Sequence, residues 1–423
     1  MAEVEISAMT FGPSGIGRIG AKTAMVPGCV PGDLLEVGVE SERRGYIIAR
    51  IERVIRPGPS RRIPPCPYLP RCGGCDWQQI EYAAQVRFKG QAIARELARV
   101  PGLEHLAANG AGLVQAAPAE FGYRARLRFK VGADGVVGFH EAGSRRLVPI
   151  DHCMVGDAAL KTPVEFARAL RCGEIEVVAS GARQVVVAHL LKPARRGEID
   201  RANRIVNDDP AVAGAILKCG RDRIVLGDAS VPVRLEAGLE LEADADQFSQ
   251  VNRAQNQRLV AAVMEMAAPA AGVNVLDLFC GAGNFSLPAA RRGAVVTGAD
   301  AEAAAIEAAR RNALRLGFER AQFVAIKAAE MAKFLTRARS RPDAVILDPP
   351  RDGAPELIGA LAAMRPACVI YVSCDAATLA RDLRGLVEAG YWIDRTGAFD
   401  FFPNTHHAEI VVRAVLTSIR GRS

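Results

Sequence analysis

The stretch NVLDLFCGAGNFSLPAARRG, residues 274–293, decides the fold of the C-terminal part of the chain. It predicts a short apolar strand, a loop containing Gly281 and Gly283, and the start of a helix. Glycines let the backbone turn tightly and approach a ligand, and a helix N-terminus favours an anionic group. Asp300 ends the next apolar segment, where a carboxylate can accept hydrogen bonds from ribose hydroxyls. Because the third glycine of the dinucleotide fingerprint is missing, the loop favours a ligand with a ribose and an amino-acid tail.

Short apolar segments continue to alternate with helical ones towards the C-terminus. Strands are expected at 294–300, 322–326, 343–350 and 368–374, and helices at 302–317 and 377–390. This alternation predicts a parallel, doubly wound α/β domain over residues 241–423. Ligands of such open sheets bind at the carboxyl ends of the strands. Asp348 in ILDPPRDG takes such a position, held extended by the proline that follows it, although a solvated turn is an alternative interpretation.

Cys374 in YVSCDAATLARD takes the same kind of position at another strand end. A cysteine inside an apolar strand is usually structural, but Cys374 lies at the strand exit, ahead of a helix start that modestly favours the thiolate. The segment FDFFPNTHHAEIVV, residues 399–412, offers a carboxylate, Glu409, with His407 as local support and Asp400 as a lesser candidate. A nucleophilic cysteine with a separate general base is the predicted arrangement, and a polar surface turn is the alternative for this segment.

The remainder of the chain predicts two further domains. Residues 1–56 contain short alternating strands separated by glycine turns, which favours a small closed OB-like barrel. Its arginines at 43, 44, 50, 53 and 56 indicate either a solvated face or a platform for RNA. A proline-rich break at 56–65 follows, and residues 57–240 then read as a largely antiparallel α+β domain.

Composition narrows the class of protein. A length of 423 residues favours two or three domains, and a formal charge of +7 with a pI near 9.0 favours polyanionic partners without identifying them. The apolar runs are too short to cross a bilayer, and the N-terminus lacks the pattern of a secretory signal. We therefore expect a cytoplasmic protein without a membrane partner, in which ten cysteines argue against a disulfide framework.

Three cysteines lie close together in CPYLPRCGGCDW: Cys66, Cys72 and Cys75. Cys153 in DHCMVGD is a possible fourth. Such a set predicts a tetrathiolate metal site, and the spacing alone leaves zinc and an iron–sulfur cluster open.

Five motifs together resemble the RNA 5-methyluridine methyltransferase family over the whole chain: DLFCGAGNFS, FSQVNRAQN, LDPPRDG, SCDAATLARD and FPNTHHAEIVV. The resemblance implies an N-terminal TRAM domain of OB type, a central domain, and a class I, Rossmann-like methyltransferase domain. It implies Cys374 as nucleophile and Glu409 as general base, with Phe248 near the target base. The implied S-adenosylmethionine contacts, together with the glycine loop, are Gln250, Phe279, Gly281, Gly283, Asn284, Asp300 and Asp348.

The implied reaction explains why a methyltransferase would need a thiolate. C5 of uracil is a poor nucleophile, and addition of the thiolate to C6 would place electron density on C5 before methyl transfer. The C5 proton must then be removed so that elimination releases the enzyme. Asp375 and Ala376 stand where family members often carry Asn and Pro, and we expect the chemistry to survive that difference.

The cysteine pattern resembles the branch of the family that carries a [4Fe–4S] cluster and modifies 23S rRNA. That resemblance implies rRNA as substrate, with transfer RNA second, and a monomer as the family default. Two alternatives stay open at this point. An RNA cytosine-C5 methyltransferase usually has Pro before its cysteine, where this chain has Ser373. A non-catalytic RNA-binding ribosome-assembly factor would need neither Cys374 nor Glu409.

Overall fold

The computed structural model describes residues 1–417, so the last six residues of the expected domain 241–423 lie outside the described part. Contacts divide the chain into two compact units whose segments alternate along the sequence. The first comprises Met1–Pro67, Cys75–Pro118 and Asp348–Ser423, and the second comprises Tyr68–Gly74 and Ala119–Leu347. No helix of the described residues is long and apolar enough to span a membrane.

The first unit begins with a six-stranded sheet in the order β1-β5-β6-β4-β3-β2. Its strands are β1 (Ala2–Glu5), β2 (Ala8–Met9), β3 (Ser14–Ile19), β4 (Lys22–Pro27), β5 (Leu34–Glu42) and β6 (Tyr46–Arg56). Strand β3 passes close to β1, because a Cβ on Gly17 would lie 2.4 Å from the carbonyl oxygen of Glu5. Alternate side chains enter one core, which Trp77 and Ile80 complete. The hydrogen-bonded order ends at β1 and β2, so closure into a barrel stays a prediction.

The first unit also contains the C-terminal strands, in the order β21-β23-β22-β7. They are β7 (Val114–Gln115), β21 (Cys368–Ser373), β22 (Tyr391–Phe399) and β23 (Glu409–Leu416). The helices of this unit are α1 (Tyr82–Leu97), α2 (Leu106–Asn109), α9 (Pro355–Met364) and α10 (Ala376–Glu388). Strand β23 pairs antiparallel with both β21 and β22, so this part of the sheet departs from the purely parallel pattern expected from the sequence.

The second unit contains four parallel strands in the order β19-β18-β17-β20. They are β17 (Asn274–Leu278), β18 (Val295–Asp300), β19 (Ala321–Ala325) and β20 (Ala344–Leu347). The helices that alternate with them are α5 (Arg253–Ala267), α6 (Ser286–Arg291), α7 (Ala303–Arg315) and α8 (Ala328–Arg337). This alternation confirms the predicted Rossmann-like α/β fold.

A second sheet of this unit has seven strands in the order β10-β9-β8-β11-β12-β13-β14. Their bounds are β8 (Arg126–Val131), β9 (Val137–His140), β10 (Leu147–Pro149), β11 (Cys172–Ser180), β12 (Arg183–Leu190), β13 (Val212–Cys219) and β14 (Asp222–Gly227). Helices α3 (Val164–Ala169) and α4 (Arg196–Asp208) accompany it, and β15 (Ser230–Arg234) pairs with β16 (Glu240–Asp244). The pairing is antiparallel except between β12 and β13, which α4 connects.

One face of this seven-stranded sheet carries a buried carboxylate, Glu176 of β11. Burial acts to raise the pKa of Glu176, but hydrogen bonds from His189 and Arg126 and the charges of Arg126 and Arg128 bring it down to about 2. Arg126 Nη1 and Arg128 Nη2 lie 2.7 and 2.8 Å from the carboxylate. The carboxylate therefore links β8, β11 and β12.

Replacement of Glu176 by Gln should lower the free energy of unfolding at pH 7 by about 2 kcal/mol, because Arg126 loses its carboxylate partner. A folded-state pKa of about 2 lies below the ordinary value of 4.5, so this stabilisation is present above pH 4.5 and is lost as pH falls towards 2. Urea unfolding curves of the two proteins should therefore differ at pH 7 and converge near pH 2. The exposed Glu319 provides a control, and E319Q should change the free energy of unfolding by less than about 0.5 kcal/mol.

Candidate active site

A tight turn at the end of β21 holds Cys374 of the first unit. Ser373 ends the strand, and the backbone N–H of Asp375 donates to Ser373 Oγ at 3.1 Å. The Asp375 carboxylate caps α10 by accepting hydrogen bonds from the backbone N–H groups of Ala377 and Thr378 at 3.0 and 2.9 Å. Cys374 thus lies between a buried strand and a capped helix, and it is half-buried.

The Cys374 thiol is less acidic than an ordinary cysteine. Burial raises its pKa to about 11, the charges of Glu409, Asp348 and Asp375 act in the same direction, and Arg351 opposes them. The helix start was expected to favour the thiolate only modestly, and burial with the neighbouring acids acts in the opposite direction. Removal from water and neighbouring acids outweigh the helix terminus, so the thiol is protonated at neutral pH.

Glu409, the first residue of β23, lies directly beside this position in the sheet. Strands β21 and β23 pair antiparallel with Ser373 opposite Ile410, so Cys374, directly after β21, comes beside Glu409, whose charge acts on its thiol. Glu409 is only 6% exposed. Burial, followed by the charge of Asp348, raises its pKa well above the ordinary range, and Arg351 opposes that shift. The carboxyl is therefore held neutral at pH values where an ordinary glutamate is ionised.

Two further residues of the predicted base segment take different roles. Burial and the positive charges of His406 and Arg351 lower the pKa of His407 to about 4, so its ring is neutral. Arg351 Nη2 lies 3.4 Å from His407 Nε2, which places His407 beside the cation that faces Glu409. Asp400, the lesser base candidate, accepts a hydrogen bond from Lys89 Nζ at 2.6 Å, and both side chains are fully buried. That ion pair occupies Asp400, so the structure favours Glu409 over it.

The predicted glycine loop lies in the second unit, between β17 and α6. Its backbone is left-handed at Phe279, Gly281 and Gly283, with φ of 70°, 52° and 100°. The N–H of Gly281 donates to Asp300 Oδ2 at 3.0 Å, so the acid at the end of β18 is tied to the loop. Backbone left uncovered at Gly281 and Gly283 beside a fixed carboxylate suits a ligand with ribose hydroxyls.

Residues of β17 and of α5 support the glycine loop through hydrogen bonds. Ser286 Oγ donates to Asp277 Oδ2 at 2.5 Å, and burial raises the pKa of Asp277 to about 7. Asn284 exchanges two side-chain hydrogen bonds with Asn256, at 2.8 and 3.1 Å. The sequence analysis missed Asp277 and Asn256, because each supports the loop through a partner 9 or 28 residues away.

The segment before α5 carries the two other predicted contacts of this unit. Phe248 is 78% exposed, which is unusual for so large an apolar side chain. Gln250 is half-buried, and Asn252 caps α5 by accepting a hydrogen bond from the N–H of Gln255. An exposed aromatic ring of this kind is available for stacking on an unpaired base.

The four cysteines of the predicted metal site divide between the units. Cys72 and Cys153 of the second unit pack against the same core, and a charge on Cys72 would add to the burial that raises the pKa of the Cys153 thiol. Cys66 and Cys75 belong to the first unit, where the N–H of Cys66 donates to Gln78 Oε1 at 3.3 Å. The structure thus brings Cys72 and Cys153 together.

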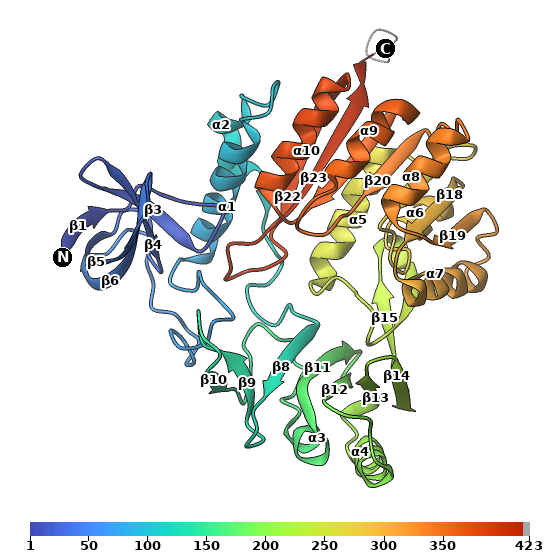
Figure 1. Cartoon of the computed structure of the whole chain (residues 1–423), viewed down its shortest axis with the longest axis horizontal. Helices are drawn as coiled ribbons and strands as arrows, with labels where there is room; N and C mark the ends of the chain where they lie inside the picture. The colour runs from blue at the N-terminus through green and yellow to red at the C-terminus, as the bar shows by residue number, and fades with distance from the viewer. Residues whose placement is uncertain (418–423) are drawn as a thin grey trace. The chain divides into compact units, whose positions relative to one another are not determined.

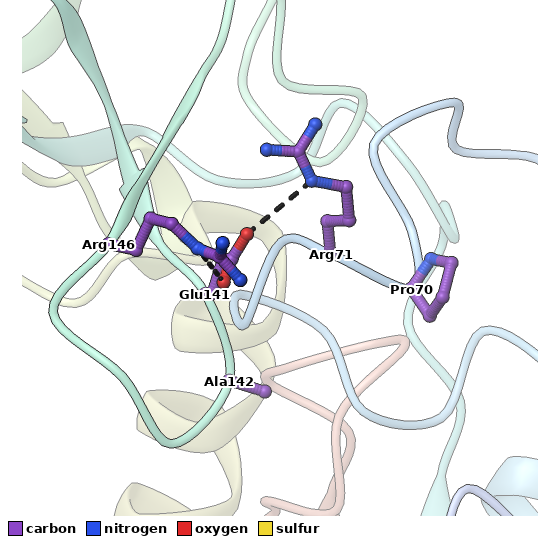
Figure 2. A pocket seen from close by; sticks show the side chains of 5 residues that line it. All are labelled: Pro70, Arg71, Glu141, Ala142 and Arg146. Carbon is purple, nitrogen blue, oxygen red and sulfur yellow. Dashed lines mark hydrogen bonds and ion pairs between the residues drawn. The ribbon is translucent and has the colours of Figure 1, made fainter.

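The segment around Cys72 is fixed by the β9–β10 hairpin of the second unit. The N–H of Gly73 donates to the carbonyl oxygen of His140 at 2.9 Å, and the backbone of Cys72 pairs with that of Glu141 in an isolated antiparallel β-bridge. Figure 2 shows that Arg71 and Arg146 both bind the Glu141 carboxylate, at 3.4 and 2.7 Å. The Arg71 pair holds the cysteine segment against the hairpin, and the Arg146 pair lies within the hairpin itself.

Comparison with known proteins identifies the family of the chain. A family model described as tRNA (Uracil-5-)-methyltransferase matches residues 221–416. The 23S rRNA (uracil(1939)-C(5))-methyltransferase RlmD of Shewanella amazonensis is 32% identical over 414 residues, covering 94% of this chain and 91% of that protein. The enzyme of the same name from Pseudomonas aeruginosa is 33% identical over 424 residues, covering 93% and 90%. The chain belongs to the RNA uracil-C5 methyltransferase family.

A solved structure agrees on the fold. The Pyrococcus abyssi tRNA (uracil-54, C5)-methyltransferase, crystallised with S-adenosyl-L-homocysteine, superposes with a TM-score of 0.75 at 24% identity, covering 98% of this chain and 100% of that one. The family model and the two relatives confirm the predicted family and enzyme class, an RNA uracil-C5 methyltransferase. The cytosine-C5 and non-catalytic alternatives are set aside.

One family motif contains a supporting residue that the sequence analysis passed over. Asp382, the last residue of the run ATLARD, is buried and accepts hydrogen bonds from Tyr371 Oη at 2.6 Å and from the N–H of Ala354 at 2.9 Å. Thr378 Oγ1 of the same helix donates to the carbonyl oxygen of Arg351 at 3.0 Å. Helix α10 therefore positions both Cys374 at its start and the loop that carries Arg351.

Alkylation of Cys374 by iodoacetamide should rise about tenfold per pH unit from pH 7 to 9, because its pKa is about 11. The rate, followed by mass spectrometry of the peptide that contains Cys374, should rise about threefold in Glu409→Gln at pH 9 and fall by a similar factor in Arg351→Gln. One variant removes the neighbour that raises the pKa of the Cys374 thiol, and the other removes the neighbour that lowers it. A rate that levels off below pH 8 would show that the thiol is already ionised there.

Substitution of the loop glycines should separate backbone strain from steric conflict. A Cβ at residue 283 would lie 2.7 Å from Leu287 Cδ1 at a φ of +100°, whereas one at residue 281 would meet open space at a φ of +52°. Gly283→Ala should therefore cost about 3 kcal/mol in free energy of unfolding, and Gly281→Ala about 1 kcal/mol. Urea unfolding without ligand measures both, and equal losses would contradict the steric argument.

Proposed function

We propose that this chain methylates C5 of one uridine in 23S rRNA through a covalent bond between Cys374 and C6. The observation that carries the proposal is the register of β21 and β23, which sets a half-buried thiol opposite a buried carboxyl. A pure RNA-binding protein has no use for that pair. The substrate follows from the relatives, whose printed names are those of 23S rRNA enzymes and which match over most of their length.

The charges of the site suggest the order of the steps. Thiolate and carboxylate oppose each other's ionisation, so the pair would hold a single negative charge, first on Cys374. When sulfur bonds to C6, an electron pair moves to C5, which can then take the methyl group, and the sulfur becomes an uncharged thioether. Ionisation of Glu409 is then no longer opposed by the thiolate, so its carboxyl can release its proton to solvent and the resulting carboxylate can accept the C5 proton. The C5–C6 double bond re-forms as the sulfur–C6 bond breaks, which returns the thiolate.

S-adenosylmethionine would supply the methyl group from its sulfonium. The residues proposed to bind it are Gln250, Phe279, Gly281, Gly283, Asn284, Asp300 and Asp348. Their support is the left-handed backbone at Phe279, Gly281 and Gly283 and the fixed position of Asp300 beside the loop. Phe248 is proposed to stack on the target base, because its ring is already exposed in the protein without RNA.

We propose that Cys66, Cys72, Cys75 and Cys153 hold a [4Fe–4S] cluster, with zinc as the second candidate. Four thiols form a donor set that suits either, and the interaction of Cys72 with Cys153 supports a shared site. A cluster there would stabilise the fold or contact RNA, because methyl transfer needs no electrons. Iron and sulfide analysis of anaerobically purified protein decides between the two.

The domain organisation proposed is an RNA-binding TRAM barrel at 1–56, a central domain at 57–240 and the methyltransferase domain at 241–423, in a cytoplasmic monomer. Arg50, Arg53 and Arg56 of β6 support an RNA-facing barrel, because each guanidinium is about two-thirds exposed. Their acidic partners Glu52, Glu36 and Glu5 lie at the surface as well, so an RNA phosphate can compete for them.

The decisive experiment is methyl transfer from labelled S-adenosylmethionine to rRNA and to bulk transfer RNA, each from cells that lack this enzyme. Wild type should produce 5-methyluridine in 23S rRNA, Cys374→Ala should produce none, and Glu409→Gln should accumulate a protein–RNA adduct. Cys368→Ala, which removes a half-buried thiol six residues earlier, is the matched control and should stay active.

Two results would redirect or remove the proposal. Labelling of transfer RNA instead of rRNA would keep the mechanism and change the substrate. Failure to bind S-adenosylmethionine at all would contradict the methyltransferase reaction itself.

A further inference from the structure

The turn that precedes Glu409 is polar in sequence but buried in the first unit. Asp400 and Asn404 are both fully buried, and Asn404 adopts a left-handed backbone with a φ of 68°. A residue other than glycine holds that conformation only when its surroundings determine it. The contacts that determine it come from a segment more than 300 residues earlier in the chain.

Asp76 and Trp77, which directly follow Cys75, bind this turn through hydrogen bonds. Their backbone N–H groups donate to the carbonyl oxygen of Asn404 at 3.2 and 3.0 Å. The Asp76 carboxylate accepts a hydrogen bond from the N–H of His406 at 3.0 Å through Oδ1, and its Oδ2 lies 2.5 Å from His406 Nδ1. Asp76 thus binds the turn at two residues, three and five positions before Glu409.

Helix α1 holds the same turn from a second side. Gln85 accepts a hydrogen bond from the N–H of Asn404 at 2.8 Å and donates to Asn404 Oδ1 at 3.1 Å. Lys89, one helical turn later, donates to Asp400 at 2.6 Å and to the carbonyl oxygen of Phe402 at 3.0 Å. Gln85 and Lys89 of α1 fix residues 400 to 404, and the Asp76 carboxylate fixes His406, three residues before Glu409.

We propose that Asp76 is a positioning residue for the proton-abstraction step, holding the 404–406 turn so that Glu409 faces Cys374. The inference rests on the proposed catalytic pair and extends it to a residue outside the methyltransferase motifs. Glu409 acts after the sulfur–C6 bond has formed, so loosening the turn slows the steps that follow adduct formation. Loss of mere structural support would instead weaken cofactor binding, RNA binding and adduct formation together.

Because adduct formation precedes proton abstraction, Asp76→Ala should slow turnover without preventing the adduct. Its kcat should fall about tenfold while KM for RNA stays within about twofold, since misplacing a catalytic group by a fraction of an ångström has effects of this size. The fraction of enzyme trapped as protein–RNA adduct at steady state, measured on denaturing gels, should rise as it does in Glu409→Gln. Asp76→Asn keeps an acceptor for the N–H of His406 and should recover most of the lost kcat.

Asp394→Ala is the matched control, because it removes an aspartate of β22 that pairs with Arg413 of β23 away from the turn. It should leave kcat and adduct fraction unchanged. If Asp76→Ala lowers adduct formation, RNA binding and Tm together, and Asp76→Asn behaves alike, Asp76 is only structural and the inference is overturned. If Glu409→Gln itself shows no adduct while wild type methylates RNA, the assignment of the base fails, and the role of Asp76 fails with it.

Discussion

The proposed chemistry depends on the crowding of acidic groups around a half-buried thiol and a buried carboxyl. The Cys374 thiol and the Glu409 carboxyl lie opposite each other, Asp348 acts on both, and the charge of Arg351 opposes their protonation. Coulomb repulsion is strong at low dielectric, so full ionisation of all three acids is unfavourable. A site of this kind favours one negative charge at a time, and a reaction that moves the charge from sulfur to oxygen suits it.

Several other buried carboxylates of the chain have different neighbours. Asp33 is bound by Arg61 Nε at 2.8 Å, Asp400 by Lys89, and Glu176 by Arg126 and Arg128. Each of these carboxylates has a basic partner in direct contact, as structural burial of a charge requires. At Glu409 the balance is reversed, because burial and Asp348 outweigh Arg351. Asp277 also has a raised pKa and no basic partner among the described residues, but its carboxyl is hydrogen-bonded to Ser286, so a pKa raised by burial marks both acids, and the sequence alone shows neither.

The sequence predicted what short-range patterns control. The glycine loop, Asp300 and Cys374 follow from strand ends and turn chemistry within a few residues, and the parallel order of β17 to β20 follows from strand–helix alternation. The raised pKa of Cys374 was missed because burial arises from packing of distant segments. The antiparallel β23 was not foreseen, since a terminal strand carries no signal of direction. The contacts of Gln85 with Asn404 and of Asp76 with His406 span 319 and 330 residues, beyond any local pattern.

A protonated nucleophile also has a consequence for selectivity. With a thiol pKa of about 11, only about one molecule in ten thousand carries the thiolate at pH 7. Ionising the thiol there costs about 5 kcal/mol, and in the proposed mechanism the binding of RNA must supply it. Protein contacts with parts of the RNA away from the target base can supply this free energy, because a free uracil makes too few contacts to do so. A thiol that ionises only against a correctly held substrate stays unreactive towards other electrophiles, and a uridine outside its proper RNA context is left unmodified.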